Sequence, residues 1–154
     1  MIHASCRASS AASGASLRTA QQASGDVNQA IATYGKLVAM QPLSPVPYIR
    51  LAEAQVVNKD LKAAEQSLRK AVELKPDMLE AQRGLVLLAL DGKRYGDALK
   101  LARTVQEQRP KELVGYAMEG DIDVAQKNWD AAAAAYRAGL QRGASTELAI
   151  KLST

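Results

Sequence analysis

Side chains that commonly carry catalysis or bind metal ions are almost missing from this chain. Its only histidine is His3 and its only cysteine is Cys6, both close to the N-terminus. A zinc site needs several converging His, Cys or acidic ligands, and an activated nucleophile needs a general base beside it. The glycines are scattered and form no phosphate-binding loop. We therefore expect no metal site, no cofactor and no catalytic nucleophile in the rest of the chain.

Three aspartates, Asp121, Asp123 and Asp130, are the remaining candidates for acid–base chemistry. Residues two apart on a helix point in different directions, so Asp121 and Asp123 are not expected to face one substrate. Trp129 can be interpreted as a stacking platform for a ligand or as a packing residue at the start of a helix, and the packing interpretation is favoured. These residues together predict a protein that is not an enzyme.

The composition favours a single helical domain. Of the 154 residues, 47% are hydrophobic and 23% are charged, which is typical of soluble domains. Alanine is abundant and phenylalanine is absent, which favours closely packed helices over a sandwich or barrel. The net charge of +4 includes Arg7 and Arg18 from an acid-free N-terminal stretch, and no Lys/Arg run follows. We expect no nucleic-acid binding and, since no long apolar run is present, no membrane insertion.

A fixed spacing runs through the chain. Pro42, Pro76 and Pro110 follow one another at equal intervals of about 34 residues. The same interval separates four alanines: Ala30, Ala64, Ala98 and Ala132. Prolines stop helices, and small side chains let two helix backbones approach closely. A period of about 34 residues with these features indicates helix–turn–helix repeats whose paired helices are antiparallel.

The apolar periodicity between the prolines gives the expected helices. Short polar turns, such as Asn58–Asp60 and Asp91–Lys93, separate the two helices of a pair. We expect helices over residues 27–40, 45–58, 61–74, 79–91, 95–108, 113–126 and 129–142, a weak helix over 15–23, and another that begins at Glu147.

The units resemble the tetratricopeptide-repeat (TPR) superfamily across residues 25–146. In the second unit, the packing positions of the family hold Tyr48, Leu51-Ala52, Ala64, Leu68, Ala71 and Pro76. The resemblance implies an all-α fold, a TPR α-solenoid in which antiparallel helix pairs form a right-handed superhelix. It implies about four repeats within residues 15–146, the first of them degenerate. Residues 1–14 are expected to be a disordered leader or an artefact, and 147–154 the start of a truncated or capping helix.

A narrower resemblance rests on the residue order of the last repeats. It is carried by Pro76–Gln82, Gly115–Asp121, Ala125–Lys127 and Ala131–Arg137. These segments resemble the TPR protein of the bacterial PEP-CTERM/exosortase system, which is tied to exopolysaccharide and envelope assembly. That resemblance implies a fragment of a longer array in the periplasm or cell envelope. Without it, the cytoplasm is the expected compartment.

The TPR resemblance also implies where a ligand binds. In such solenoids positions 2, 5, 9 and 12 of the first helix of each pair line a concave groove. Here these positions hold Val46, Ile49, Glu53 and Val56 in the second unit, Glu80, Arg83, Leu87 and Leu90 in the third, and Val114, Ala117, Asp121 and Val124 in the fourth. The Lys and Asn clamp that chaperone-binding relatives place at positions 5 and 9 is missing. Acids outnumber bases along these positions, so the expected ligand is apolar, such as an amphipathic helix with Lys or Arg, and not an acidic tail.

Two classes of function remain. The first is a scaffold that binds a peptide or protein segment in the groove, and the second is a structural element that assembles with copies of itself. Because repeat units bury their faces only against neighbours, the apolar face around Tyr136 and Leu140 is expected to be poorly covered. Dimerisation through that end, or its fraying, is the consequence that we expect.

Overall fold

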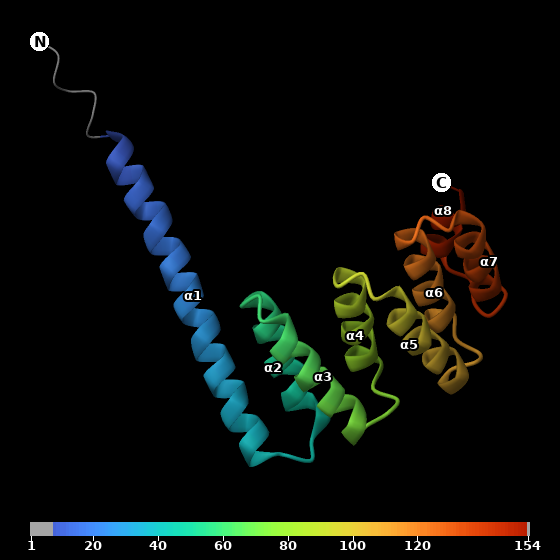
Figure 1. The fold of residues 1–154 in the computed structure, drawn as a ribbon, viewed down its shortest axis with the longest axis horizontal. Coiled ribbons are helices and arrows are strands. Elements are labelled where there is room, and N and C mark those ends of the chain that lie inside the picture. Colours follow the sequence, from blue (N-terminus) through green and yellow to red (C-terminus); the bar gives the residue numbers. More distant parts are fainter. Residues whose placement is uncertain (1–7, 154) are drawn as a thin grey trace, which may run out of the picture.

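The computed structural model describes the backbone of residues 8–153 and the side chains of residues 23–153. Within these residues eight helices follow one another and no strand occurs, so the prediction of an all-α fold is confirmed (Figure 1). The helices are α1 Ala8–Met40, α2 Pro45–Val57, α3 Leu61–Leu74, α4 Leu79–Asp91, α5 Tyr95–Gln108, α6 Val114–Ala125, α7 Trp129–Leu140 and α8 Thr146–Ser153.

Helices α2 to α7 form three hairpins whose bounds lie within two residues of the sequence prediction. Each helix packs chiefly against the helices before and after it in the chain. The core is correspondingly divided into successive clusters, one around Ile49 and Leu68, the next around Val105 and Ile122, and the last around Tyr136 and Leu148. This near-neighbour packing is the architecture of a solenoid.

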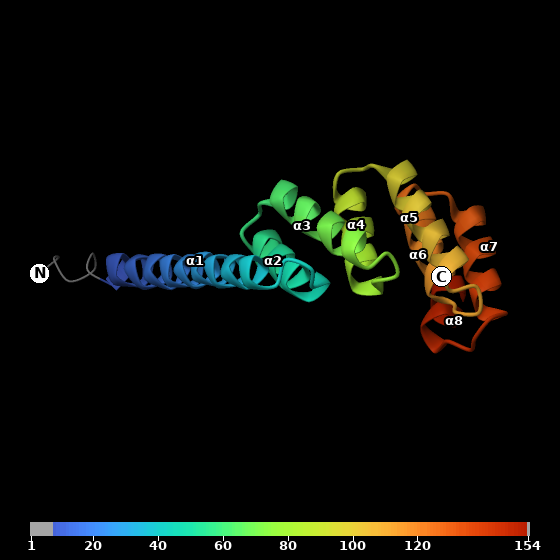
Figure 2. The ribbon, with the colours of Figure 1, turned by 90° about the horizontal axis from the view of Figure 1, so that it is seen from below.

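The first repeat differs from its prediction. The sequence predicts a weak helix over 15–23 and a separate helix over 27–40, but α1 runs through residues 24–26 without a break. Figures 1 and 2 show α1 as one long rod that extends away from the other helices. The helix also begins at Ala8, inside the expected leader, while residues 1–7 of that leader lie outside the described part of the chain.

The turns inside the three hairpins share one unusual backbone conformation. Lys59, Lys93 and Lys127 have φ angles of 61°, 55° and 61°, in the left-handed region. In each turn the residue after the lysine donates its N–H to a carbonyl five residues earlier, such as Asp60 N to Gln55 O at 2.9 Å. This is the Schellman ending of a helix, which satisfies carbonyls that the helix itself leaves open.

From the second repeat onward, the alanines that define the repeat period are buried in the core. Ala64 and Ala98 are 0% exposed and Ala132 is 3% exposed. The three prolines act at the junctions between repeats, and each of their carbonyls accepts a hydrogen bond from the following repeat, the first from Tyr48 Oη to Pro42 O at 3.3 Å. Gln82 Nε2 donates to Pro76 O at 2.9 Å, and Arg142 Nε donates to Pro110 O at 3.2 Å.

The C-terminal face is covered, contrary to expectation. Helix α8 lies against α7, and Leu148 joins the core cluster that contains Tyr136. Tyr136 is buried as a result, and Leu140 packs against the same cluster. Helix α8 begins one residue before the helix expected from Glu147, takes the place of the next repeat's first helix and supplies the apolar surface that covers α7.

Candidate functional site

An apolar hollow lies between α2 and α4, and we call it the α2/α4 groove. Its volume is about 620 Å³. Buried Ile49 and Ala52 form part of its lining, and Val56 and Leu87 line it as exposed side chains. Gly84 lets Leu68 of α3 reach the groove, because a Cβ at position 84 would lie 2.7 Å from Leu68 Cδ1.

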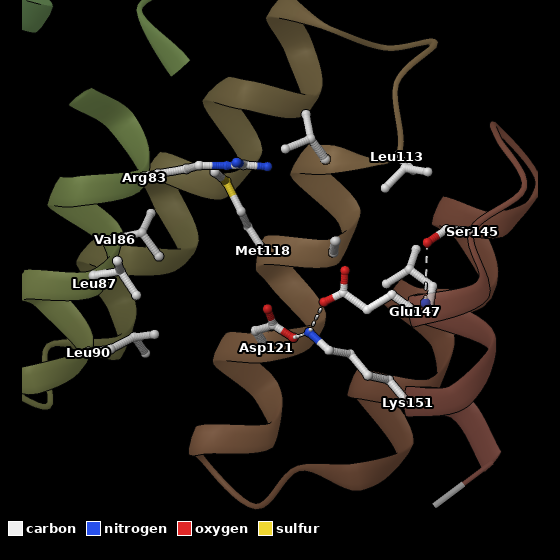
Figure 3. Close-up of a pocket in the computed structure, with 13 residues that line it drawn as sticks. Arg83, Val86, Leu87, Leu90, Leu113, Met118, Asp121, Ser145, Glu147 and Lys151 are labelled. Atoms are coloured by element: carbon white, nitrogen blue, oxygen red, sulfur yellow. Dashed lines mark hydrogen bonds and ion pairs between the residues drawn. The ribbon is translucent and has the colours of Figure 1, made fainter. Parts of the chain in front are cut away.

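A second hollow of about 370 Å³ lies between α4, α6 and α8, and we call it the α4/α6 groove. Figure 3 shows Val86, Leu87 and Leu90 of α4 on one side, with Met118 and Asp121 of α6 opposite them. Arg83 and Leu87 line both grooves, so the two form one surface along the first helices of the repeats.

The predicted groove residues are gathered mainly in these two places. The α2/α4 groove contains Ile49, Glu53, Val56, Glu80, Arg83 and Leu87. The α4/α6 groove adds Leu90, Val114, Ala117 and Asp121. Val124 instead lines a third hollow beside α7 and α8, and exposed Val46 lines none of the three.

Two of the predicted ligand contacts are core residues. Ile49 is 2% exposed and belongs to the cluster that holds α2, α3 and α4 together, and Val114 is also buried. The side chain of Ile49 packs against α4 and also lines the α2/α4 groove. Ile49 therefore forms the floor of the groove, while Val56 and Leu87 are the accessible apolar contacts.

The α2/α4 groove carries less net negative charge than its predicted lining residues indicated. Arg50 Nη1 lies 2.9 Å from Glu53 Oε2 and 3.3 Å from Glu80 Oε1, so one cation bridges both carboxylates. The hydrogen bond from Arg50 to Glu53, followed by the charges of Glu53 and Glu80, raises the pKa of the guanidinium. The helical spacing of Arg50 and Glu53 could have indicated their pairing. The bridge to Glu80, which belongs to the next repeat, depends on the packing of α2 against α4.

A similar neutralisation occurs in the α4/α6 groove. Lys151 of α8 places its Nζ 2.7 Å from Asp121 Oδ1 and 3.3 Å from Glu147 Oε1 (Figure 3). The hydrogen bond to Asp121 is the main cause that raises the pKa of Lys151. Neither Arg50 nor Lys151 was among the predicted groove residues, because their cationic groups reach the groove from other positions of the repeat.

Trp129 is a correction to the sequence interpretation. The residue begins α7 as expected, but its side chain is 63% exposed instead of packed in the core. It lines the third hollow, of about 540 Å³, together with Val124 and Leu152. The alanines that follow it in α7, such as Ala132, occupy the close contact, so the larger indole remains outside.

Asp123, set aside as a catalytic residue, is buried at the end of α6. Burial, with a further contribution from the charge of Glu119, raises the pKa of its carboxyl above the usual value. A raised folded-state pKa means that the native state favours the protonated form. Its contribution to stability is therefore present below the unfolded-state pKa and is lost as the pH rises through the folded-state pKa.

We accordingly expect Asp123→Asn to stabilise the protein at neutral pH by on the order of 1 kcal/mol, because it removes the cost of a buried charge. The advantage should shrink as the pH falls from neutral through the raised folded-state pKa, and it should be gone at about pH 3, below the unfolded-state pKa of about 4. Urea denaturation at both pH values measures the difference. The exposed Asp91→Asn is the matched control and should change stability little at either pH. An advantage of Asp123→Asn that grows in acid would contradict the assignment.

No cluster of three or more His, Cys, Asp or Glu side chains suited to a metal ion occurs among residues 23–153. None of the helices in the described part of the chain combines the length and apolar character needed to cross a bilayer.

The hairpins, the Schellman turns and the grooves along the first helices define a helical-repeat solenoid, a fold that presents a surface to partners. The chain belongs to the tetratricopeptide repeat-like domain family, whose model matches residues 3–154. No curated protein matches the sequence.

Solved structures of MamA share the fold. One crystal structure of MamA is 21% identical with a TM-score of 0.66, and the match covers 75% of this chain and 68% of that one. A MamA chain from Desulfovibrio magneticus RS-1, residue 41 to the end, is 17% identical with a TM-score of 0.66. That match covers 90% of this chain and 78% of the MamA chain. At these identities the likeness shows the fold alone, and it confirms the solenoid prediction.

Proposed function

We propose that the chain is an interaction scaffold that holds an apolar protein segment in the α2/α4 and α4/α6 grooves. The observation that carries the proposal is the apolar α2/α4 groove with two accessible apolar side chains, Val56 and Leu87, of which Leu87 is 65% exposed. Exposed apolar residues gathered at one hollow typically mark a surface that a partner covers. An amphipathic helix is the segment whose shape fits a groove between two helices.

The charges beside the groove favour a ligand with a basic side chain. Glu53 and Glu80 remain about half exposed even though Arg50 bridges them. Exposed ion pairs are worth only about 0–1 kcal/mol, so a Lys or Arg of the ligand can replace Arg50 at little cost. An acidic tail meets the same two carboxylates and finds no Lys and Asn clamp.

Helical peptides selected from a displayed library against the protein provide the test. We expect Leu87→Asp to weaken the selected peptides at least tenfold, equivalent to about 1.4 kcal/mol, because a carboxylate enters the apolar contact. Val57→Asp is the matched control, since Val57 is 66% exposed on α2 but lines neither groove. Equal affinity for both variants in fluorescence anisotropy would place the binding site elsewhere.

Self-assembly is the alternative function, and the exposure of Trp129 and Val124 favours it. These side chains leave an apolar area near the C-terminal end in addition to the grooves. Two apolar areas on one chain allow copies to meet head to tail. Light scattering during size-exclusion chromatography over a range of concentrations distinguishes the functions. A mass that rises with concentration and falls back in Trp129→Asp supports assembly, and a constant monomer mass excludes it.

The narrower resemblance of Gly115–Asp121 and its companion segments extends the scaffold proposal to bacterial envelope or exopolysaccharide assembly. The test is cell fractionation with an antibody against the chain in its native host. Recovery in the periplasmic or envelope fraction supports this role, and recovery in the cytosol alone contradicts it.

A further inference from the structure

One face of α1 is less covered than its counterparts in the other repeats. Ala30, Tyr34 and Leu37 are each only half-buried. The residues one repeat period later, Ala64, Leu68 and Ala71, are 0%, 4% and 0% exposed. The corresponding residues of the third repeat, Ala98, Ala102 and Val105, are all 0% exposed.

The difference has a structural cause. In the second and third repeats this face packs against the first helix of its own hairpin, α2 or α4. In the first repeat the residues that would form that helix continue along the axis of α1 instead, and Figure 2 shows them pointing away from the solenoid. This face of α1 therefore has the residue types of a buried face, but the first helix of its own hairpin is not packed against it.

The sequence carries a turn signal at the place where α1 stays straight. The left-handed residues Lys59 and Lys93 lie one repeat period apart, and the position one period before Lys59 is Gly25. Glycine adopts the left-handed conformation without the steric cost that lysine bears there. A β-carbon at Gly25 would meet nothing within 4 Å, so close packing does not explain the glycine in the straight helix.

The residues around Gly25 match the second hairpin as well. Asp60 accepts a hydrogen bond from Ala63 N at 3.1 Å and caps α3, and Asp26 stands in the same place of the first repeat. Ser67 Oγ donates to Gln55 Oε1 at 2.8 Å, which ties α3 to α2. The equivalent residue types are Thr33 and Gln21, although Thr33 Oγ1 in the straight helix donates to Gln29 O at 2.9 Å instead.

We propose that the α1 face formed by Ala30, Tyr34 and Leu37 is a docking surface for residues 10–23 of the same chain, which reach it by a Schellman turn at Gly25–Asp26. The turn converts the straight helix into a complete first hairpin. Residues 10–23 would then form the first helix of the first hairpin and lie beside α2, in the same arrangement as α2 beside α4. The grooves between first helices would be extended by one helix. Residues 10–23 also supply Leu17 at the position of Leu51 and Leu85.

The residue type at one position of the segment is expected to oppose closure. Arg18 occupies the position that Ala52, Val86 and Gly120 hold in the other repeats. Gly120 faces Tyr136, the equivalent of Tyr34, while Ala52 shares a core cluster with Leu68 and Val86 shares one with Ala102. An arginine opposite a tyrosine keeps the two helices apart, so closure competes with the hydrogen bonds of an uninterrupted helix.

The test is a distance between two spin labels in the full chain, at Ala12→Cys and Lys36→Cys with Cys6→Ser. In the straight helix these positions are separated by about 36 Å, from the rise of about 1.5 Å per residue. In a hairpin they lie on neighbouring helices whose axes are about 10 Å apart. Labelled chains are diluted with unlabelled chains, so that a distance within one chain is told apart from a distance between copies.

The expected result is a short-distance population that survives dilution. Gly25→Ala should reduce the ratio of short to long distances about tenfold or more, because alanine favours the helix and disfavours the turn. Gly35→Ala is the matched control, since its β-carbon is equally free of contacts and its position is not a turn in any repeat. Arg18→Ala should raise the short-distance population.

Two results would overturn the proposal. The first is that only the long distance between the labels is found in every variant, including Arg18→Ala. That result would show that α1 is a single rigid helix. The second is a short distance that disappears on dilution, which assigns the docking surface to another copy of the chain.

Discussion

Ile49→Asp is expected to unfold the region around α2 and α3, with a loss on the order of 4 kcal/mol, although the sequence places this residue in the ligand groove. Ile49 is 2% exposed and shares its cluster with Leu68 and Leu85. A carboxylate at this position loses its water and finds no partner in an apolar cluster, and burial of an unpaired charge is among the few single changes with so large a cost.

Far-UV circular dichroism during urea denaturation measures this loss. Ile49→Val is the control that keeps the apolar character and should cost about 1 kcal/mol. Leu87→Asp, at the accessible edge of the same groove, should leave the urea midpoint nearly unchanged while it weakens ligands. A fully cooperative wild-type-like transition in Ile49→Asp would show that the floor of the groove is open to water.

Gly120→Ala should destabilise the last hairpin by about 2 kcal/mol, even though alanine normally strengthens a helix. A β-carbon at position 120 would overlap the ring of Tyr136. That ring cannot move away easily, because it is 3% exposed and its hydroxyl donates to Asp121 Oδ1 at 2.6 Å. Burial is the main cause that raises the pKa of Tyr136, so the hydroxyl stays protonated as a donor.

The size of the residue at this contact is balanced from repeat to repeat. Ala52 pairs with Leu68, Val86 with Ala102, and Gly120 with Tyr136, and each pair occupies equivalent positions. The double variant Gly120→Ala with Tyr136→Leu recreates the pair of the second repeat. We expect its loss of stability to be smaller than the sum of the losses of the two single variants. The difference, measured by thermal denaturation, should be a coupling energy of about 1 kcal/mol or more.

Gly35→Ala is the control for helix propensity, because no atom lies within 4 Å of its β-carbon. It should stabilise α1 by about 0.5–1 kcal/mol. If Gly120→Ala stabilised the protein to the same extent, the close approach of α6 and α7 at this point would be disproved.

The repeat period and the three hairpins from α2 to α7 could be predicted from the sequence alone. The period of about 34 residues follows from Pro42, Pro76 and Pro110, which end helices by local backbone chemistry. The alanines of the same register predicted close packing of the paired helices, and Ala64 and Ala98 are fully buried. These features are local or strictly periodic, so they can be predicted without knowing which helices pack together.

The accessibility and the charge pairing of the groove residues depend on how the helices pack, and the sequence did not predict them. Ile49 and Leu87 are both apolar residues at predicted groove positions, but Ile49 is buried between α2, α3 and α4, whereas Leu87 on α4 remains 65% exposed. Arg50 reaches from α2 to Glu80 of α4, and Lys151 reaches from α8 to Asp121 of α6. Such contacts between different helices depend on the packing of successive repeats, which the 34-residue periodicity of the sequence does not predict.

The first repeat shows the same limit in its backbone. Gly25 and Asp26 carry a turn signature that matches Lys59 and Asp60, and yet α1 runs straight through them. A local signal lowers the cost of a turn, but a hairpin forms only when the two helices gain enough contact to offset the lost helical hydrogen bonds. In the second hairpin Ala52 allows that contact, whereas Arg18 stands in its place in the first repeat. The turn residues are thus determined by the sequence, and the packing of the helices decides whether the chain uses them.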